Sequence, residues 1–320
     1  MTDVVLITGG LGYVGGRIAQ ALAQCGKHRL RLTTRCPDLT PPAWLRTAEV
    51  VSLDVTRDAD FDQACSRITS IVHLAAINEQ DSVADPQRAL LVNSLGTLKL
   101  LQAAQRARVE RFIYFSTAHV YGAPLAGTIT ERTLPRPTHP YAITHHAAED
   151  FVLAAHAQQA LTGIVLRMSN GFGAPAHAGV DRWTLIVNDL CRQAVTQKQL
   201  VLRSSGLQRR DFITLGDAGR AVDHVLHLSA AACSDSLFNL GGECPLSVIE
   251  LAERIAERCA ATLGFRPAIQ RPRPAVDEIG TALDYRIDKL KQTGFALRGG
   301  MNAEIDATLQ LCQQAFGAAP

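Results

Sequence analysis

The chain opens with Val4-Val5-Leu6-Ile7-Thr8-Gly9-Gly10-Leu11-Gly12-Tyr13-Val14-Gly15, and Arg17-Ile18-Ala19-Gln20-Ala21-Leu22 follows. This pattern predicts an apolar strand, a glycine-rich turn and an amphipathic helix ending near Gly26. A glycine turn allows close backbone approach, and the helix start directs free N–H groups and a positive dipole end at it. Because a second predicted strand, 29–34, follows, the stretch indicates a dinucleotide-binding βαβ unit. Its predicted cofactor contacts are Gly9, Gly12, Tyr13, Val14 and Gly15.

The composition is that of an ordinary globular protein. The 320 residues are 47% hydrophobic and 19% charged, with a formal net charge of +2. This charge argues against nucleic acid or acidic membranes as the main partner. No apolar run reaches the roughly 18 residues that span a bilayer, and the N-terminus resembles no signal peptide. The eight cysteines form no C-x-x-C pair. We therefore expect a cytoplasmic protein with reduced thiols.

The end of the second strand bears on the choice of cofactor. A carboxylate at this point binds the 2′-hydroxyl of NAD and repels the 2′-phosphate of NADP. Here the chain has Thr33, Thr34 and Arg35, and the next carboxylate is Asp38. Since the Arg35 guanidinium is able to pair with a phosphate, the sequence favours NADP over NAD. The alternative is that Arg35 is a solvated strand end.

Three further segments predict contacts with the same cofactor. A third strand, 49–53, leads to Asp54-Val55, which are suited to accept from the adenine amino group and to cover its ring. A fourth strand, 70–74, ends at Leu74 and is followed by Ala75-Ala76, small residues that let a cofactor lie against the backbone. Asn93 interrupts the apolar face (Leu90, Leu91, Leu95, Leu98 and Leu101) of a predicted helix, 86–108. It is either a buried bridging amide or a surface residue.

Hydroxyl groups follow the fifth predicted strand, 111–115. Ser116 and Thr117 stand at its carboxyl end, where an open α/β sheet binds its ligand. A further helix opens at Pro140-Tyr141, and the four-residue spacing places Tyr141 and His145 on one helical face.

Taken together, these motifs resemble those of the nucleotide-sugar epimerase/dehydratase branch of the extended short-chain dehydrogenase/reductase superfamily. The matching segments cover residues 4 to 300 in the family's order: Thr8 to Gly15, His73 to Ala76, Ser116 to Gly122, Tyr141, Leu166 to Gly173, Arg210 to Ile213, and Phe238 to Gly242. The resemblance implies a Rossmann-type doubly wound parallel sheet with a smaller C-terminal substrate-binding domain. It also implies hydride transfer at a sugar carbon of a nucleotide-diphosphate sugar.

The resemblance implies a role for each residue at the reacting carbon. Tyr141 would be the acid/base, and Thr117 would bind the same substrate oxygen, with Ser116 as the less favoured neighbour. The family's lysine, four residues after the tyrosine, is His145 here. A lysine lowers the phenol pKa and binds the nicotinamide ribose, whereas an unperturbed histidine is mostly neutral at pH 7. Three readings remain: a protonated His145 substitutes, His146 or another cation supplies the charge, or the chain binds cofactor and turns over poorly.

The remaining family positions bear on the reaction and the substrate. The family's dehydratases use an Asp-Glu pair directly after the threonine, where this chain has Ala118-His119, so 4,6-dehydration is disfavoured. Epimerisation and ketoreduction need only hydride transfer and the tyrosine. By the resemblance, Asn170 and Arg210 contact the substrate diphosphate; the alternative for Arg210 is a structural pair with Asp211. The resemblance also places a diphosphate contact near Arg271 to Pro274 without choosing an arginine.

The sequence also predicts how the chain is divided. The dinucleotide-binding domain is residues 1–170, with about 209–242 returning to it, and the smaller domain is 171–208 and 243–320. The family implies a homodimer formed through the helices that carry Asn93 and Tyr141. No metal is predicted, because His139, His145 and His146 lack the spacing of a tetrahedral set. A catalytically inactive binding protein and a dehydrogenase of a non-nucleotide hydroxy or keto substrate remain as alternatives.

Overall fold

The computed structural model describes residues 3–35, 43–45, 48–57, 60–229, 231–233 and 235–317. Its centre is a seven-stranded sheet whose neighbouring strands are all parallel, in the order β11-β7-β5-β4-β1-β2-β3. The strands are β1 (Val4–Thr8), β2 (Arg29–Thr34), β3 (Glu49–Ser52), β4 (Ser70–His73), β5 (Arg111–Thr117), β7 (Thr162–Met168) and β11 (Leu237–Leu240). The strand order reverses between β1 and β4, which is where a doubly wound sheet binds its ligand. The predicted fold class is confirmed.

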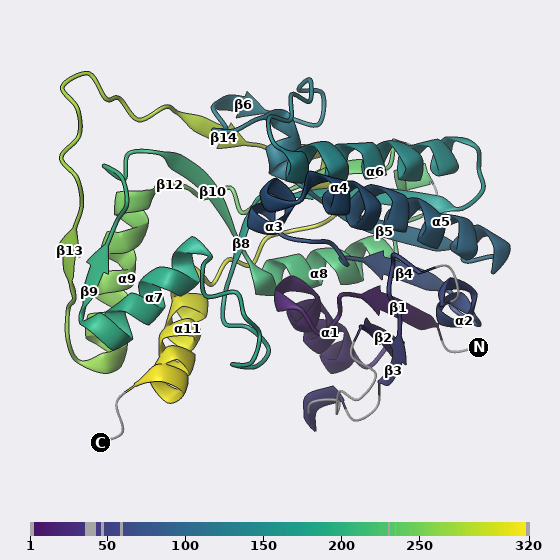
Figure 1. Ribbon diagram of the computed structural model, residues 1–320, viewed down its shortest axis with the longest axis horizontal. Coiled ribbons are helices and arrows are strands. Elements are labelled where there is room, and N and C mark those ends of the chain that lie inside the picture. The colour runs from purple at the N-terminus through teal and green to yellow at the C-terminus, as the bar shows by residue number, and fades with distance from the viewer. Residues whose placement is uncertain are drawn as a thin grey trace.

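Helices cover both faces of this sheet (Figure 1). One face packs against α1 (Tyr13–Cys25) and α8 (Leu215–Leu226), which lie side by side. The other face packs against α2 (Phe61–Cys65), α5 (Gly96–Arg106) and α6 (Pro140–Ala157). Each face has its own buried aliphatic core, because strands covered on both sides carry apolar residues at successive positions. Short helical segments lie between these elements: Ala43–Leu45, α3 (Glu79–Ala84), α4 (Pro86–Ala89), Ala118–Tyr121, Ala231–Cys233 and α10 (Asp288–Gln292).

The helix predicted over 86–108 is interrupted. A π-helical segment, Leu90–Leu95, separates α4 from α5 and contains Asn93. The extra residue in this turn rotates the apolar pattern, so that Leu90 and Leu91 are 54% and 50% exposed. Leu95 is also exposed, whereas Leu101 is buried. The prediction of one continuous apolar face was therefore wrong for the first three leucines, and Asn93 is buried in the turn together with Val92 and Ser94.

A second layer of structure lies beyond the carboxyl ends of the main sheet. Its helices α7 (Ile186–Gln197), α9 (Val248–Leu263) and α11 (Met301–Phe316) pack together around a third apolar core. Ser247 and Glu250 form the N-terminal capping box of α9. The accompanying short strands form three small sheets, namely β12 (Pro245–Ser247), β10 (Arg209–Thr214) and β8 (Asn170–Phe172); β13 (Ala268–Gln270) with β9 (Gln199–Val201); and β14 (Leu283–Tyr285) with β6 (Gly127–Ile129).

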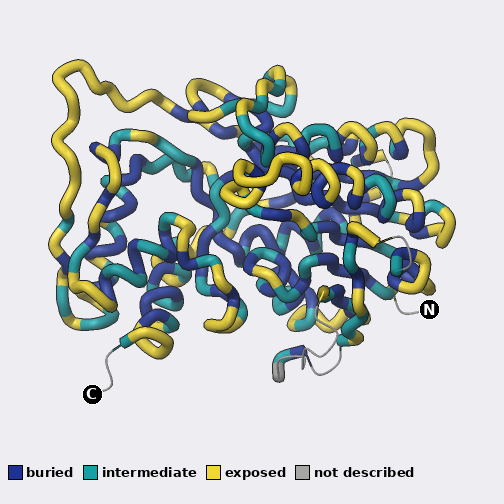
Figure 2. Tube along the Cα trace, viewed as in Figure 1, coloured by how far each residue is buried: buried dark blue, intermediate teal, exposed yellow. Residues whose placement is uncertain are grey.

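The chain crosses between the two layers more than once. α8 and β11 belong to the main layer, whereas β10 pairs with β8 and β12 in the smaller one. The predicted domain boundaries stay a prediction. Residues 271–280, between β13 and β14, are exposed throughout and run along the outside of the molecule (Figure 2).

Two general properties follow from the described part of the chain. None of its helices combines the length and the apolar character that crossing a membrane would need. Its cysteines are all free thiols, and they are Cys25, Cys65, Cys191, Cys233, Cys244, Cys259 and Cys312. Of these, Cys25 is exposed and Cys244 is half-buried, whereas the other five are buried.

Candidate active site

The glycine-rich turn between β1 and α1 has the shape of an anion cradle. Gly9 has φ +66°, and a Cβ there would approach the Ala75 nitrogen to 3.2 Å. A Cβ on Gly15 would lie 2.2 Å from the Gly9 carbonyl oxygen. Gly12 is the exposed N-cap of α1, so the N–H groups of the first turn have no intrahelical partner. The backbone therefore fits the pyrophosphate of a dinucleotide.

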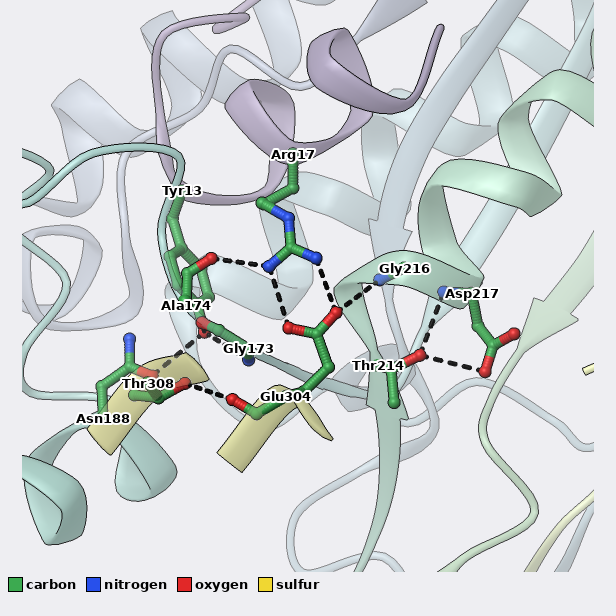
Figure 3. A network of polar contacts seen from close by, with 10 residues as sticks. All are labelled: Tyr13, Arg17, Gly173, Ala174, Asn188, Thr214, Gly216, Asp217, Glu304 and Thr308. Atoms are coloured by element: carbon green, nitrogen blue, oxygen red, sulfur yellow. Dashed lines mark hydrogen bonds and ion pairs between the residues drawn. The ribbon is translucent and has the colours of Figure 1, made fainter. Parts of the chain in front are cut away.

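The side chains of Tyr13 and Arg17, in the first two turns of α1, face the smaller layer rather than the glycine turn (Figure 3). The Tyr13 hydroxyl donates to the Gly173 carbonyl oxygen at 2.8 Å and to Asn188 Oδ1 at 3.2 Å. Arg17 holds both carboxylate oxygens of Glu304 on α11, at 2.9 and 2.6 Å. The Tyr13 phenol is thus committed to the contact between the two layers, which leaves its backbone and that of Val14 on the cofactor side.

A buried polar network fixes the loop after β4. His73 lies between the hydroxyls of Thr8 and Thr97, at 2.6 and 2.9 Å. Thr8 Oγ1 also accepts from the Leu74 and Ala75 amides, at 3.1 and 3.2 Å. The positions predicted to lie against the cofactor, Leu74 to Ala76, are therefore held beside the glycine turn.

Asn93 is the bridging amide rather than a surface residue. Its Oδ1 accepts from the Ile77 amide at 2.9 Å, and its Nδ2 donates to Thr144 Oγ1 at 3.1 Å. The π-helical turn aims this amide inwards, where it joins the loop after β4 to the first turns of α6. Asn93 thus holds both the loop after β4 and the start of α6, which form two sides of the candidate site.

The predicted adenosine side is more open. Arg35 is exposed directly after β2, and Asp38 lies outside the described residues. Asp54 Oδ1 accepts from the Thr56 amide at 2.9 Å and from its hydroxyl at 2.7 Å. These two bonds lower the pKa of Asp54, and the nearby charge of Arg35 lowers it further. Val55 is buried against Gly96.

Tyr141 and His145 share one face of α6, as their spacing predicted. Their ring centroids are 4.4 Å apart, and the imidazole is 3% exposed. His145 Nδ1 is hydrogen-bonded to the Tyr114 hydroxyl at 2.7 Å. His145 Nε2 is buried without a partner in the described structure. A buried nitrogen of this kind is a free group for a ligand hydroxyl.

Burial sets the charge state of this pair. Desolvation lowers the pKa of His145 to about 3, so the imidazole is neutral at pH 7. Desolvation also raises the pKa of Tyr141 to about 12. The structure therefore argues against a protonated His145 as the electrostatic substitute for lysine.

Another cation acts on the tyrosine instead. The charge of Arg182 lowers the pKa of Tyr141, while that of Glu79 raises it. Asn188 binds the Arg182 carbonyl oxygen at 3.1 Å, and so links this loop to Tyr13. Sequence reasoning did not find Arg182, because no fixed spacing relates its loop to α6. This supports the second of the three readings, in which His146 or another cation supplies the positive charge near Tyr141. Arg182 is the candidate for that cation.

The hydroxyl residues lie at the carboxyl end of β5. Thr117 caps the helical turn 118–121, and its Oγ1 accepts from the His119 amide at 3.2 Å. This leaves the hydroxyl hydrogen to donate elsewhere. Ser116 Oγ is buried and has no partner within the described structure.

Arg210 and Asn170 meet at a small hollow. The hollow has a volume of about 40 Å³ and is lined by His119, Asn170 and Arg210, among others. Arg210 donates to Gln208 at 3.1 Å, whereas the Asp211 carboxylate accepts from Ser169 and from the amides of residues 242 and 244. The alternative of an Arg210–Asp211 pair is therefore wrong. Asn170 Nδ2 donates to the Asp211 carbonyl oxygen at 3.0 Å.

The basic segment after β13 is divided between two environments. Arg271 donates to the Ser205 carbonyl oxygen at 2.5 Å, so its guanidinium already has a structural partner. Arg273 is exposed.

A buried ion pair supports the helix that carries Tyr141. Glu149 lies two turns after Tyr141, on the same face of α6. It receives three hydrogen bonds from Arg167 on β7, and the two side chains are 0% and 4% exposed. Sequence reasoning missed this pair, because the partners lie on different elements and carry no motif that joins them.

Comparison with known proteins agrees with this geometry. Residues 5–241 match the model of the NAD dependent epimerase/dehydratase family. A dTDP-glucose 4,6-dehydratase of Streptomyces niveus is 28% identical over 309 residues, covering 92% of this chain and 88% of that protein. A 3 beta-hydroxysteroid dehydrogenase/Delta 5-->4-isomerase of Mycobacterium tuberculosis is 39% identical over 180 residues, covering 53% and 47% of the two chains.

Solved structures show the same fold. The UDP-glucuronic acid 4-epimerase of Bacillus cereus, in complex with NAD, superposes with a TM-score of 0.80 at 21% identity, covering 99% of this chain and 98% of that one. The chain therefore belongs to the NAD-dependent epimerase/dehydratase family, within the extended short-chain dehydrogenase/reductase superfamily. The enzyme class expected from the sequence is confirmed at the level of this family.

Proposed function

We propose that this chain is an NAD(P)-dependent epimerase or ketoreductase of a nucleotide-diphosphate sugar, with Tyr141 as its acid/base. The observation that carries the proposal is that three features stand at the carboxyl-terminal side of one parallel sheet. These are the glycine cradle, the Tyr141–His145 pair, and the hydroxyl of Thr117 at the end of β5. When bound, the nicotinamide supplies the acceptor and donor of a hydride.

The chain's own residues then divide the remaining work. Tyr141 moves the proton of the sugar hydroxyl, and Thr117 donates to the same oxygen. The charge of Arg182 opposes the rise in the pKa of Tyr141 that burial causes. His145 Nε2 is available to a ribose hydroxyl, while its Nδ1 remains on Tyr114. His145 thus replaces the hydrogen bond of a lysine and not its charge.

The substrate side favours a diphosphate. Burial lowers the pKa of Arg210, and Glu79 is the charge that opposes this effect. Among the described residues, Gln208 is the hydrogen-bond partner of the Arg210 guanidinium. A guanidinium of this kind, beside a hollow shared with Asn170, is suited to a phosphate oxygen. A hydroxysteroid would offer this half-buried cation no anionic group, although one relative is named for that class of substrate.

The dinucleotide itself is NAD in the family's description, and we propose NADP as the preferred form on the strength of Arg35. Arg35→Ala should remove any preference for NADP, as measured by fluorescence titration with both reduced dinucleotides. The control is Arg57→Ala, an exposed arginine just beyond Asp54. Equal affinity of the unmodified chain for both forms would contradict the NADP proposal.

A second candidate function is that of a weakly active or inactive binding protein. It is favoured by the neutral state of His145 and by the high pKa of Tyr141, about 12. Both candidates predict dinucleotide binding, and only the first predicts turnover that Tyr141→Phe abolishes.

We also propose a homodimer. Leu90, Leu91 and Leu95 on the π-helical turn are exposed, and so are Ile143 and Phe151 on the adjacent α6. An apolar surface of this kind on two packed helices is typical of a subunit interface. Leu91→Glu should convert the dimer to a monomer in analytical ultracentrifugation, and Leu134→Glu, another exposed leucine, is the control. The cytoplasmic location stays a prediction.

The test of the proposed function starts from the purified chain. Mass spectrometry of molecules released on denaturation should identify a dinucleotide. A panel of UDP- and dTDP-hexoses should then yield a C4 epimer by NMR, or the corresponding keto sugars should yield a reduced sugar when the reduced dinucleotide is supplied. Bound dinucleotide without conversion of any nucleotide sugar would leave the second candidate and overturn the first.

A further inference from the structure

Two histidines and an aspartate converge at the edge of the sheet opposite the candidate active site. His28 lies between α1 and the amino end of β2, Asp223 is in the last turn of α8, and His227 is the C-cap of that helix. Asp223 and His227 are four residues apart and therefore share one helical face. Their ligand atoms and one from His28 all lie within 4.8 Å of one another.

Three polar atoms of these side chains are buried without a hydrogen-bond partner in the described structure. The His28 side chain is 4% exposed, and neither of its ring nitrogens has a hydrogen bond within the described structure. Asp223 Oδ1 is also buried without one. Lys27 donates to the other carboxylate oxygen, Oδ2, at 3.2 Å, and so leaves Oδ1 to the two imidazoles. Buried polar atoms are normally satisfied, so a site with three open nitrogen and oxygen atoms points to a missing ligand.

The distances match the spacing of a metal centre. Asp223 Oδ1 is 3.8 Å from His28 Nε2 and 3.8 Å from His227 Nδ1. Bonds of about 2.0–2.1 Å around a tetrahedral zinc separate its ligand atoms by about 3.3 Å, so each imidazole nitrogen closes on Asp223 Oδ1 by about half an ångström. The three ligand atoms lie within 4.8 Å of one another before that closure. His227 Nδ1 now contacts the Asp223 carbonyl oxygen at 2.7 Å and would exchange this contact for the metal. His227 is exposed and has room to turn.

We propose that His28, Asp223 and His227 bind a Zn²⁺-like divalent transition metal ion. Two imidazoles and one carboxylate suit zinc, cobalt or nickel and disfavour Mg²⁺ and Ca²⁺, which prefer oxygen ligands. An open hollow of about 470 Å³, lined by Asp223 and His227, gives the ion and its water ligands access.

The metal would join the start of β2 to the end of α8. It is a structural site, independent of the proposed chemistry, because it lies at the amino ends of the strands. The sequence prediction of no metal concerned three histidines that are close in the chain. His28 is far from the Asp223–His227 pair in sequence, so spacing alone did not bring the three residues together.

The test is calorimetric titration of the full chain, without a histidine tag and after chelator dialysis, with Zn²⁺ alone. We expect one ion per chain, at least about tenfold weaker binding in both His227→Gln and Asp223→Asn, and no binding of Mg²⁺. His224→Gln is the matched control: it lines the same hollow but bonds Thr293, and should bind as the unmodified chain does.

Co²⁺ absorption separates this site from a thiolate site. The proposed ligands predict weak visible bands and no sulfur charge-transfer band, and Cys25→Ser should leave the spectrum unchanged. The proposal is overturned by absence of saturable Zn²⁺ binding, by binding that survives His227→Gln, by equal losses in His224→Gln and His227→Gln, or by a sulfur band. Because His227 is exposed, its variant should fold even if Asp223→Asn does not.

Discussion

Replacing Glu149 by Gln tests how the helix of Tyr141 is held. The Glu149 carboxylate accepts from Arg167 Nε at 3.0 and 3.1 Å and from Nη2 at 2.6 Å, with both side chains almost fully buried. The variant keeps the shape and removes the charge, so Arg167 remains as an uncompensated buried cation. Removing one partner of a buried ion pair costs about 3–5 kcal/mol. We expect a loss of this size in the free energy of unfolding.

Urea unfolding followed by far-UV circular dichroism measures this loss. Asp62→Asn is the control, because its pair with Arg106 is largely exposed and contributes about 1 kcal/mol or less. Replacing Glu149 and Arg167 together by Met should recover most of the loss, since a buried ion pair is replaceable by apolar side chains of similar volume. A loss in Glu149→Gln no larger than that of the control would refute the anchoring role.

The other predictions concern charge around Tyr141 and acid stability. His145→Lys adds a positive charge, which favours the phenolate, so the acidic limb of the kcat/KM profile should move to lower pH; His146→Lys, on a neighbouring face, should move it less. Arg182→Gln removes a charge that lowers the pKa of Tyr141, and should move the same limb to higher pH. Burial lowers the pKa of His73 and His145 to about 3, whereas in the unfolded chain it is about 6.5. Only the unfolded state therefore takes up these protons between about pH 6 and 3, and stability falls with falling pH by about 1.4 kcal/mol per unit for each histidine. His73→Gln should remove about half of this slope in urea unfolding, and an unchanged slope would contradict the assignment.

Local pattern was sufficient for the fold and for the centre of the site. The glycine turn with its flanking strand and helix was enough to predict the first βαβ unit. The apolar strands, which are covered on both faces, were enough to predict the parallel sheet. The i, i+4 spacing placed Tyr141 beside His145. The capping box of α9 was equally local. These features depend on neighbours in the chain, which a sequence displays directly.

Features that depend on tertiary contacts were not predictable. The π-helical turn inverts the exposure of three leucines, because a single extra residue shifts a periodic pattern. The charge state of His145 follows from burial against Tyr114, not from the residue type. Arg182 and the Glu149–Arg167 pair join distant elements. His28 and His227 also lie on distant elements, so the sequence did not indicate that they come together.

The most direct test of the central claim is the effect of Tyr141→Phe on turnover and on dinucleotide binding, measured in the same preparation. We expect kcat/KM for the nucleotide sugar to fall by about 10²–10⁴-fold, the usual contribution of a general acid/base. Dinucleotide affinity should change little, because the glycine cradle is untouched. Turnover that survives the loss of this hydroxyl would contradict the assignment of Tyr141 and leave the chemistry to another group.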